Sequence, residues 1–156
     1  MMKKPLRIIS GGQTGVDRAA LDVAMALCLP CGGWCPRGRR AEDGAIPLHY
    51  PMKEMDSPRY IDRTRQNVSD ADATLILTWG EVTGGTAATL AFALEAAKPH
   101  LVVDLTGSPA HEEISQWIDD LQLKTLNVAG PRGSRDPQVY PRAREVLEAA
   151  LGARAG

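Results

Sequence analysis

The chain has 156 residues, of which 44% are hydrophobic, and its formal net charge is −1. This length suits a single globular domain over residues 1–156, and the near-neutral charge gives no general attraction to nucleic acid or to an anionic membrane. The apolar run near the N-terminus is too short for a signal peptide and no later run approaches ~18 apolar residues, so we expect a cytoplasmic protein with neither membrane nor nucleic-acid partners.

Apolar and amphipathic segments alternate along the chain. In chain order, we predict a strand over 6–10, a helix over 16–29, a short strand over 33–36, a helix over 59–70, a strand over 74–78, a helix over 86–97, a strand over 100–104, a helix over 111–123, a strand over 125–129 and a helix over 138–151. Short strands that alternate with helices are typical of a parallel sheet covered on both faces. We therefore predict an α/β fold, a Rossmann-like three-layer sandwich with a mainly parallel sheet of about five strands.

Residues 37–58 break this alternation. More than twenty residues without periodicity are unusual in a compact domain, and such segments are commonly functional loops. We predict a loop or lid here.

The first predicted strand ends in a glycine-rich turn made of Gly11, Gly12, Gln13, Thr14 and Gly15. Open parallel sheets bind ligands at the carboxyl ends of their strands, and a helix that follows such a turn presents free N–H groups and a positive partial charge. The turn matches neither the dinucleotide GxGxxG pattern nor a P-loop. We predict that it holds the anionic part of a ligand, and the alternative is a tight turn without a ligand.

Asp17 lies in the first turn of the helix that follows. Thr14-Gly15-Val16-Asp17 fits a capping box, in which the carboxylate accepts a hydrogen bond from a backbone N–H group. Because a carboxylate repels phosphate, a functional Asp17 would instead accept a hydrogen bond from a ligand hydroxyl or N–H group. Both interpretations stay open.

A second glycine turn, made of Thr83, Gly84, Gly85 and Thr86, follows the strand over 74–78, and Thr86 is the predicted N-cap of the next helix. If the two turns end neighbouring strands, two helix N-termini point at one crevice. Trp79, before this turn, either packs in the core or stacks on a flat ligand ring.

Arginines follow two of the predicted strands. Arg37, Arg39 and Arg40 come after the strand over 33–36, and Arg132 comes after the last strand. A guanidinium at a strand end can neutralise a phosphate or carboxylate, and a solvated loop position is the alternative. The small cluster lacks interleaved aromatic residues, so it does not indicate a nucleic-acid site.

Three cysteines, Cys28, Cys31 and Cys35, have the spacing C-x-x-C-x-x-x-C. Their odd number excludes a complete disulfide framework and favours a reducing compartment. Neither a histidine nor a fourth cysteine lies nearby, so buried or incidental thiols are the preferred interpretation and a metal site is the alternative. We expect no metal bound directly by the protein.

Five segments in this order, SGGQTGVDRAALDVA, GGWCPRGRRAEDG, NVSDADATLIL, TGGTA and LNVAGPRGS, resemble the bacterial family described as putative molybdenum carriers. That family belongs to a superfamily of Rossmann-like proteins that includes the Lonely Guy (lysine-decarboxylase-like) enzymes and DNA-processing proteins. The resemblance covers nearly the whole chain. It implies a nucleotide- or molybdopterin-like ligand at the glycine turns, and a homo-oligomer, for which the small apolar residues of the helix over 86–97 are well suited.

The sequence departs from the Lonely Guy enzymes at one position. Their PGGxGTxxE stretch carries a glutamate that takes part in cleaving the base from a nucleoside monophosphate, whereas the comparable position here is Thr89. The resemblance therefore supports phosphate binding and argues against N-glycosidic hydrolysis.

We expect a binding protein for a small phosphorylated heterocycle, and molybdopterin, the molybdenum cofactor or a nucleotide are the candidate ligands. The alternative is a hydrolase of the N-glycosidic or phosphate bond of a nucleotide, with Asp17, Glu42 or Asp43 as its acid. A third interpretation is a scaffold subunit, in which the glycine turns are tight backbone turns and hold no ligand.

Overall fold

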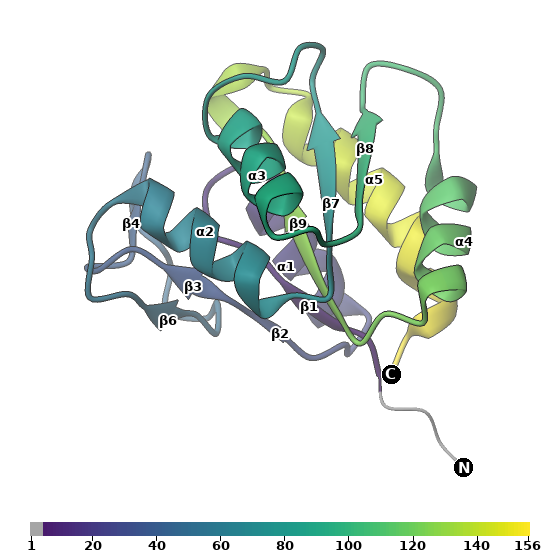
Figure 1. Ribbon diagram of the computed structural model, residues 1–156, viewed down its shortest axis with the longest axis horizontal. Coiled ribbons are helices and arrows are strands. Elements are labelled where there is room, and N and C mark those ends of the chain that lie inside the picture. Colours follow the sequence, from purple (N-terminus) through teal and green to yellow (C-terminus); the bar gives the residue numbers. More distant parts are fainter. Residues whose placement is uncertain (1–4) are drawn as a thin grey trace.

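Five parallel strands form the central sheet, in the order β2-β1-β9-β7-β8 (Figure 1). The structure is a computed structural model and describes residues 5–156, so Met1 to Lys4 of the N-terminal segment considered for targeting lie outside it. The sheet strands are β1 (Arg7–Ile9), β2 (Cys31–Gly32), β7 (Ala73–Thr78), β8 (His100–Asp104) and β9 (Thr125–Ala129). The predicted α/β class and five-stranded parallel sheet are confirmed.

The helices form a layer on each side of the sheet (Figure 1). Helices α2 and α3 pack against each other on one side, whereas α1, α4 and α5 pack together on the other. The helices are α1 (Val16–Ala26), α2 (Tyr60–Asp70), α3 (Gly84–Glu95), α4 (His111–Leu121) and α5 (Val139–Leu151), with short 3₁₀ turns η1 (Gly133–Arg135) and η2 (Gly152–Arg154). All six residues of β7 are buried, which explains its unbroken apolar sequence in a sheet covered on both faces.

Strand β9 is the last along the chain but lies in the middle of the sheet, between β1 and β7. If β9 is counted as the first strand, the observed order becomes the 3-2-1-4-5 order of a doubly wound Rossmann sheet. In the sequence analysis, the two strands that carry glycine turns are considered as neighbours. The structure differs, because β9 lies between β1 and β7.

The predicted short strand over 33–36 is divided in the structure. Gly33 has φ of +127°, and a Cβ at this residue would lie 2.2 Å from the backbone oxygen of Ser10. The chain therefore turns here, so that β2 stays in the central sheet while β3 (Trp34–Cys35) pairs with β6 (Lys53–Glu54) in a separate two-stranded sheet.

The segment over 37–58 is a structured loop. It contains the hairpin of β4 (Arg40–Ala41) and β5 (Gly44–Ala45), followed by β6. Buried Ala41, Ile46 and Tyr50 pack with Leu21 and Cys35 in a small hydrophobic cluster of their own. This cluster anchors the loop beside α1.

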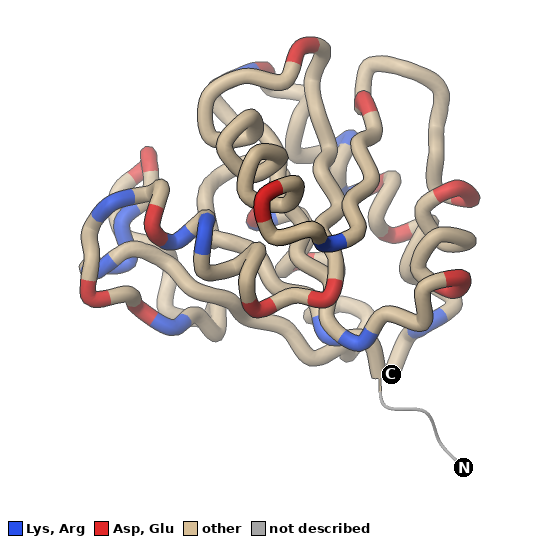
Figure 2. The backbone as a smooth tube through the Cα atoms, in the orientation of Figure 1, with Lys and Arg blue, Asp and Glu red and all other residues tan. Residues whose placement is uncertain are grey.

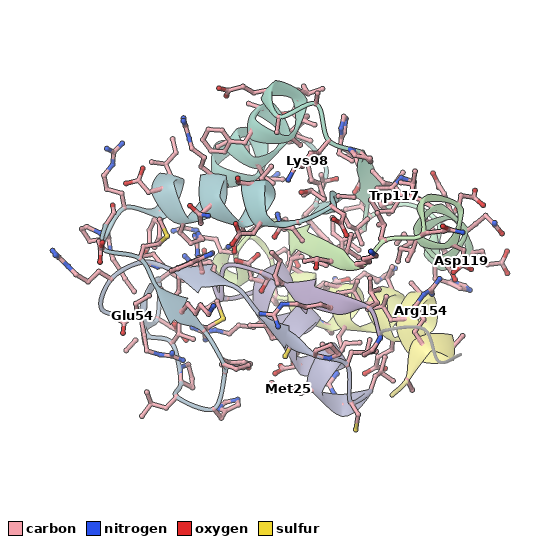
Figure 3. The ribbon with its side chains drawn as sticks, turned by 60° about the horizontal axis from the view of Figure 1, so that its bottom comes forward. Met25, Glu54, Lys98, Trp117, Asp119 and Arg154 are labelled. Carbon is pink, nitrogen blue, oxygen red and sulfur yellow. The ribbon has the colours of Figure 1, made fainter. Side chains whose placement is uncertain are left out.

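Polar contacts also join elements far apart in the sequence. Lys98, labelled in Figure 3, donates hydrogen bonds from Nζ to the backbone oxygens of Ser69 and Ala71 at the end of α2. Arg154, close to Asp119 in the same view, forms an ion pair with it and donates a 3.1 Å hydrogen bond to the Ser115 oxygen, which ties η2 to α4.

Candidate functional site

A cavity of about 280 Å³ opens at the carboxyl ends of β1, β9 and β7. The segments after all three strands line it, and α2 closes one side. This is the position where open parallel sheets bind ligands. The lining residues are Gly11, Gln13, Asp17, Arg63, Thr64, Asn67, Thr78, Trp79, Glu81, Thr83, Gly84, Gly85, Thr86, Thr89, Asn127, Val128, Ala129, Gly130, Pro131, Arg132 and Arg135.

The N-terminus of α3 faces this cavity with free backbone donors. The helix begins at Gly84, with Thr83 at the N-cap position and no side-chain cap hydrogen bond. The predicted N-cap, Thr86, lies instead in the first turn of the helix and is buried. The N–H groups of the first helical turn have no intrahelical acceptor, so they are available to an anion.

The turn from Gly11 to Gly15 forms hydrogen bonds and close packing contacts with other parts of the protein. The N–H of Val16 donates to the backbone oxygen of Pro131 at 3.2 Å, and the N–H of Thr14 donates to Oε1 of Gln13. A Cβ at Gly15 would lie 2.5 Å from the Pro131 oxygen, and a Cβ at Gly12 would lie 2.7 Å from Cδ1 of Ile46. These glycines allow close packing against other segments, and Gly12, Thr14 and Gly15 do not line the cavity.

Asp17 is buried and lines the cavity. Its Oδ2 accepts the Gln13 N–H at 3.2 Å, but Gly15 rather than Thr14 occupies the N-cap position, so the predicted reciprocal capping box does not form. Burial raises the pKa of Asp17 to about 6, although Arg63, the Gln13 and Gly11 N–H groups and Arg18 lower it. A buried carboxylate with a raised pKa in a cavity is a common feature of functional sites.

Three arginines line the cavity, and two of them lie near Tyr60. The Arg63 side chain is buried, and its Nη1 donates a 2.6 Å hydrogen bond to the Gly11 oxygen. The guanidinium carbons of Arg63 and Arg132 each lie 5.3 Å from the centre of the Tyr60 ring. Arg135 donates a 3.1 Å hydrogen bond to the Trp79 oxygen. The cavity lining therefore combines three guanidinium groups with the carboxylates of Asp17 and Glu81.

The arginines predicted to close over an anion after the strand over 33–36 do not line the cavity. Lys and Arg positions gather at the left end of the molecule, around the 37–59 segment and the start of α2 (Figure 2). Arg39 donates its hydrogen bonds to backbone oxygens of Ile46, Pro47 and Tyr50, within its own loop. The guanidinium carbon of Arg40 lies 4.5 Å from the centre of the Tyr60 ring, and neither Arg40 nor Arg37, at the start of the loop, lines the cavity.

The two loop acids hold the β4–β5 hairpin in place. Asp43 forms a two-bond ion pair with Arg18, at 2.6 and 2.8 Å. Glu42 accepts hydrogen bonds from Oγ1 of Thr14 and, at 2.7 Å, from Oγ of Ser134. Burial raises the pKa of Glu42, but these hydrogen bonds outweigh it and the net shift is downward. Neither acid lines the cavity, whereas Asp17 does.

Thr89, which the sequence analysis compares with the glutamate of the Lonely Guy enzymes, lines the cavity, and its Oγ1 donates a 3.0 Å hydrogen bond to the backbone oxygen of Gly85.

The three cysteines differ in exposure: Cys28 is exposed, Cys31 half-buried and Cys35 buried, and burial raises the pKa of the last two thiols. Within residues 5–156, no group of three or more His, Cys, Asp or Glu side chains could hold a metal ion.

Several lining residues were missed by the sequence analysis. Arg63 and Asn67 belong to an amphipathic helix, where polar residues are normally solvated, yet both are buried. Asn127 lies inside β9 and is also buried, with a 3.4 Å contact from its Nδ2 to Oγ1 of Thr74. The sequence offers one signal for Asn127 as a lining residue, which is its position as a polar residue within an otherwise apolar strand.

The unusual place of β9 in the sheet agrees with the comparison of the sequence with known families. The sequence matches the circularly permutated YpsA SLOG family over residues 8–151. The chain belongs to this family. It is also similar to a crystal structure described as that of a putative molybdenum carrier protein from Syntrophus aciditrophicus SB, with 43% identity, a TM-score of 0.90 and coverage of 96% of this chain and 98% of that one.

These similarities confirm the family resemblance and the Rossmann-like fold, and in general terms they support a ligand-binding role. No curated protein shows a significant match to the chain. Among the helices of residues 5–156, none combines the length and the apolar character that crossing a membrane requires.

Proposed function

We propose that this member of the circularly permutated YpsA SLOG family binds a small phosphorylated heterocycle, with the anionic group at the N-terminus of α3. The observation that carries the proposal is the uncapped first turn of α3, which faces a cavity also lined by Arg63, Arg132 and Arg135. Backbone N–H groups at a helix start, together with guanidinium groups, form a favourable site for a tetrahedral anion.

The turn from Gly11 to Gly15 has a different part in this proposal. The N–H groups of Thr14, within this turn, and of Val16, directly after it, already bind protein oxygens, so the phosphate contact is assigned to Gly84, Gly85 and Thr86. Gly11, Gln13 and Asp17 remain beside the ligand as cavity-lining residues.

A molybdenum-containing cargo is one candidate ligand. The similar protein from Syntrophus is described as a putative molybdenum carrier. The donors that line the cavity beside α3 suit an oxyanion better than a bare metal ion, because N–H and guanidinium groups cannot ligate a cation. The cargo would therefore be held through phosphate or molybdate oxygens.

Calorimetric titration with inorganic phosphate, molybdate and nucleoside monophosphates tests this proposal. A Cβ at Gly85 would meet no atom within 4 Å, so the backbone at the α3 N-terminus has room for the first side-chain atom of Gly85→Leu. We expect this variant to weaken nucleotide binding by more than about tenfold.

Gly152→Leu is the matched control, because Gly152 also has open space at its Cβ and lies outside the cavity. It should bind as the wild type does. Equal affinity of both variants, or no binding of any of these anions by the folded wild-type protein, would contradict the proposal.

One observation favours a hydrolase as the second candidate: Asp17 is a buried carboxylate in the cavity with a pKa of about 6. We nevertheless expect little free base from nucleoside monophosphates, because Thr89 cannot supply the proton that a glutamate would. A missing general acid typically slows a reaction by about a hundred- to ten-thousandfold. Chromatography showing rapid base release that Asp17→Asn abolishes would instead establish the hydrolase.

A further inference from the structure

Gln13 carries a buried hydrogen-bond donor without an acceptor. Its Oε1 accepts hydrogen bonds from the N–H of Thr14 at 3.1 Å and the N–H of Glu42 at 2.9 Å. Both partners are donors, so the oxygen must face them and the two ends of the amide cannot be exchanged. Among the buried side-chain polar atoms of residues 5–156, Nε2 of Gln13 is left without a partner.

Asp17, whose carboxylate accepts a hydrogen bond from the backbone N–H of Gln13, supplies an acceptor in the lining of the same cavity. The carboxylate accepts the Gln13 N–H at 3.2 Å and also interacts with the Gly11 N–H, and an ionised carboxylate has about four acceptor positions, so part of its capacity remains. Both side chains are more than nine-tenths buried and both line the cavity. Buried donors and acceptors are rarely left unpaired in folded proteins.

We infer that Gln13 and Asp17 recognise adjacent carbonyl and N–H groups of the ligand, on the edge of a 2-amino-4-oxopyrimidine ring such as that of guanine or a pterin. This inference rests on the proposed function. Nε2 of Gln13 donates to the ring carbonyl, and the Asp17 carboxylate accepts from the ring N–H and the amino group. Adenine presents the opposite pattern, with an amino donor towards Gln13 and a ring acceptor towards Asp17.

The arrangement of the cavity agrees with such a two-ended ligand. Gln13 and Asp17 follow β1, whereas Gly84, Gly85 and Thr86 follow β7, and β9 lies between the two strands. The heterocycle edge and the phosphate therefore bind on opposite sides of the end of β9.

Calorimetric titration of the 156-residue protein at neutral pH with guanosine, inosine and adenosine monophosphates, and with a pterin monophosphate, tests the inference. We expect guanosine monophosphate to bind at least about tenfold more tightly than adenosine monophosphate, and inosine monophosphate, which lacks the amino group, to fall between them. The tighter of the guanine and pterin ligands identifies the source of the ring. Equal affinity for adenine and both oxo-heterocycles would overturn the inference.

Gln13→Glu is the sharpest variant, because it keeps the oxygen that Thr14 and Glu42 contact and replaces the donor Nε2 with an acceptor. We expect it to weaken guanosine monophosphate binding by about ten- to a hundredfold and adenosine monophosphate binding much less. Gln122→Glu, at an exposed position outside the cavity, is the control for the added charge and should change neither affinity.

Asp17→Asn is a second test variant, whose result does not depend on the folding of Gln13→Glu. This variant should also lose the preference for guanine over adenine. Thermal unfolding of each sample verifies that the variants are folded. If all the nucleotides bind equally and Gly85→Leu still weakens them, the inference is wrong and the phosphate site stands. If no phosphorylated ligand binds the wild type, the proposed function itself is wrong.

Discussion

Asp17 is the residue whose protonation we expect to change near neutral pH. Burial raises its pKa from the ordinary 3.8 to about 6, with Arg63 and Arg18 as the charged groups that oppose the shift. A carboxyl group whose pKa is raised by folding stabilises the folded state below pH 3.8, and this contribution is lost as the pH rises through about 6. Carbon-detected NMR of the carboxyl groups should show Asp17 titrating near pH 6, and a midpoint near 3.8 would contradict the account.

The same titration should control ligand affinity. A protonated Asp17 loses acceptor capacity, so binding of guanosine monophosphate should weaken as the pH falls through about 6. Asp17→Asn should bind weakly at all these pH values.

The cavity-lining residues that the sequence analysis named, such as Gln13, Asp17 and Arg132 and the turn from Thr83 to Thr86, all follow predicted strands. Arg63 was missed because its burial depends on a contact with Gly11, 52 positions away.

The β4–β5 hairpin is the element that joins the glycine turn after β1 to the segment after β9. Its tip residue Glu42 accepts hydrogen bonds from Thr14 and from both the N–H and the Oγ of Ser134. We expect Glu42→Ala to free these segments, so that hydrogen exchange of the Ser134 amide becomes faster by roughly tenfold or more.

Hydrogen exchange followed by mass spectrometry measures this change. Glu113→Ala, which removes an exposed acid of α4, is the control and should leave exchange around residue 134 unaltered. Unchanged exchange in Glu42→Ala would show that the hairpin does not hold these segments.

Local patterns predicted most elements well, because β7, β8, β9 and the helices have strong apolar runs or helical periodicity. The two strands over 100–104 and 125–129 have the predicted bounds. The position of β9 in the sheet could not be predicted from such patterns, since strand order depends on contacts between distant segments. The roles of Gly12 and Gly15 depend in the same way on Ile46 and Pro131.

The molecule as a whole leaves part of one face apolar and uncovered. Helix α3 has no charged residue before Glu95, yet its buried residues are only Thr86, Thr89 and Ala93. Leu94 is 60% exposed, and Val102, on the edge strand β8, is 41% exposed. A second copy of the chain would remove this surface from water, so the homo-oligomer stays a prediction with this face as its candidate interface.

Sedimentation at micromolar concentration tests this prediction. We expect a dimer or larger assembly for the wild type and a monomer for Leu94→Glu, because a buried unpaired charge opposes association. Leu121→Glu, at a 42% exposed position on α4, should assemble normally. A wild-type monomer at these concentrations would remove the oligomer from the account.

Backbone amide NMR during addition of guanosine monophosphate locates the anionic group of the ligand. The N–H groups of Gly84, Gly85 and Thr86 should shift together and saturate, because the phosphate accepts their hydrogen bonds at the start of α3. The N–H groups of Thr14 and Val16, already bonded to Gln13 Oε1 and the Pro131 oxygen, should move much less. Saturable binding that leaves the three α3 amides unshifted would contradict the proposed site.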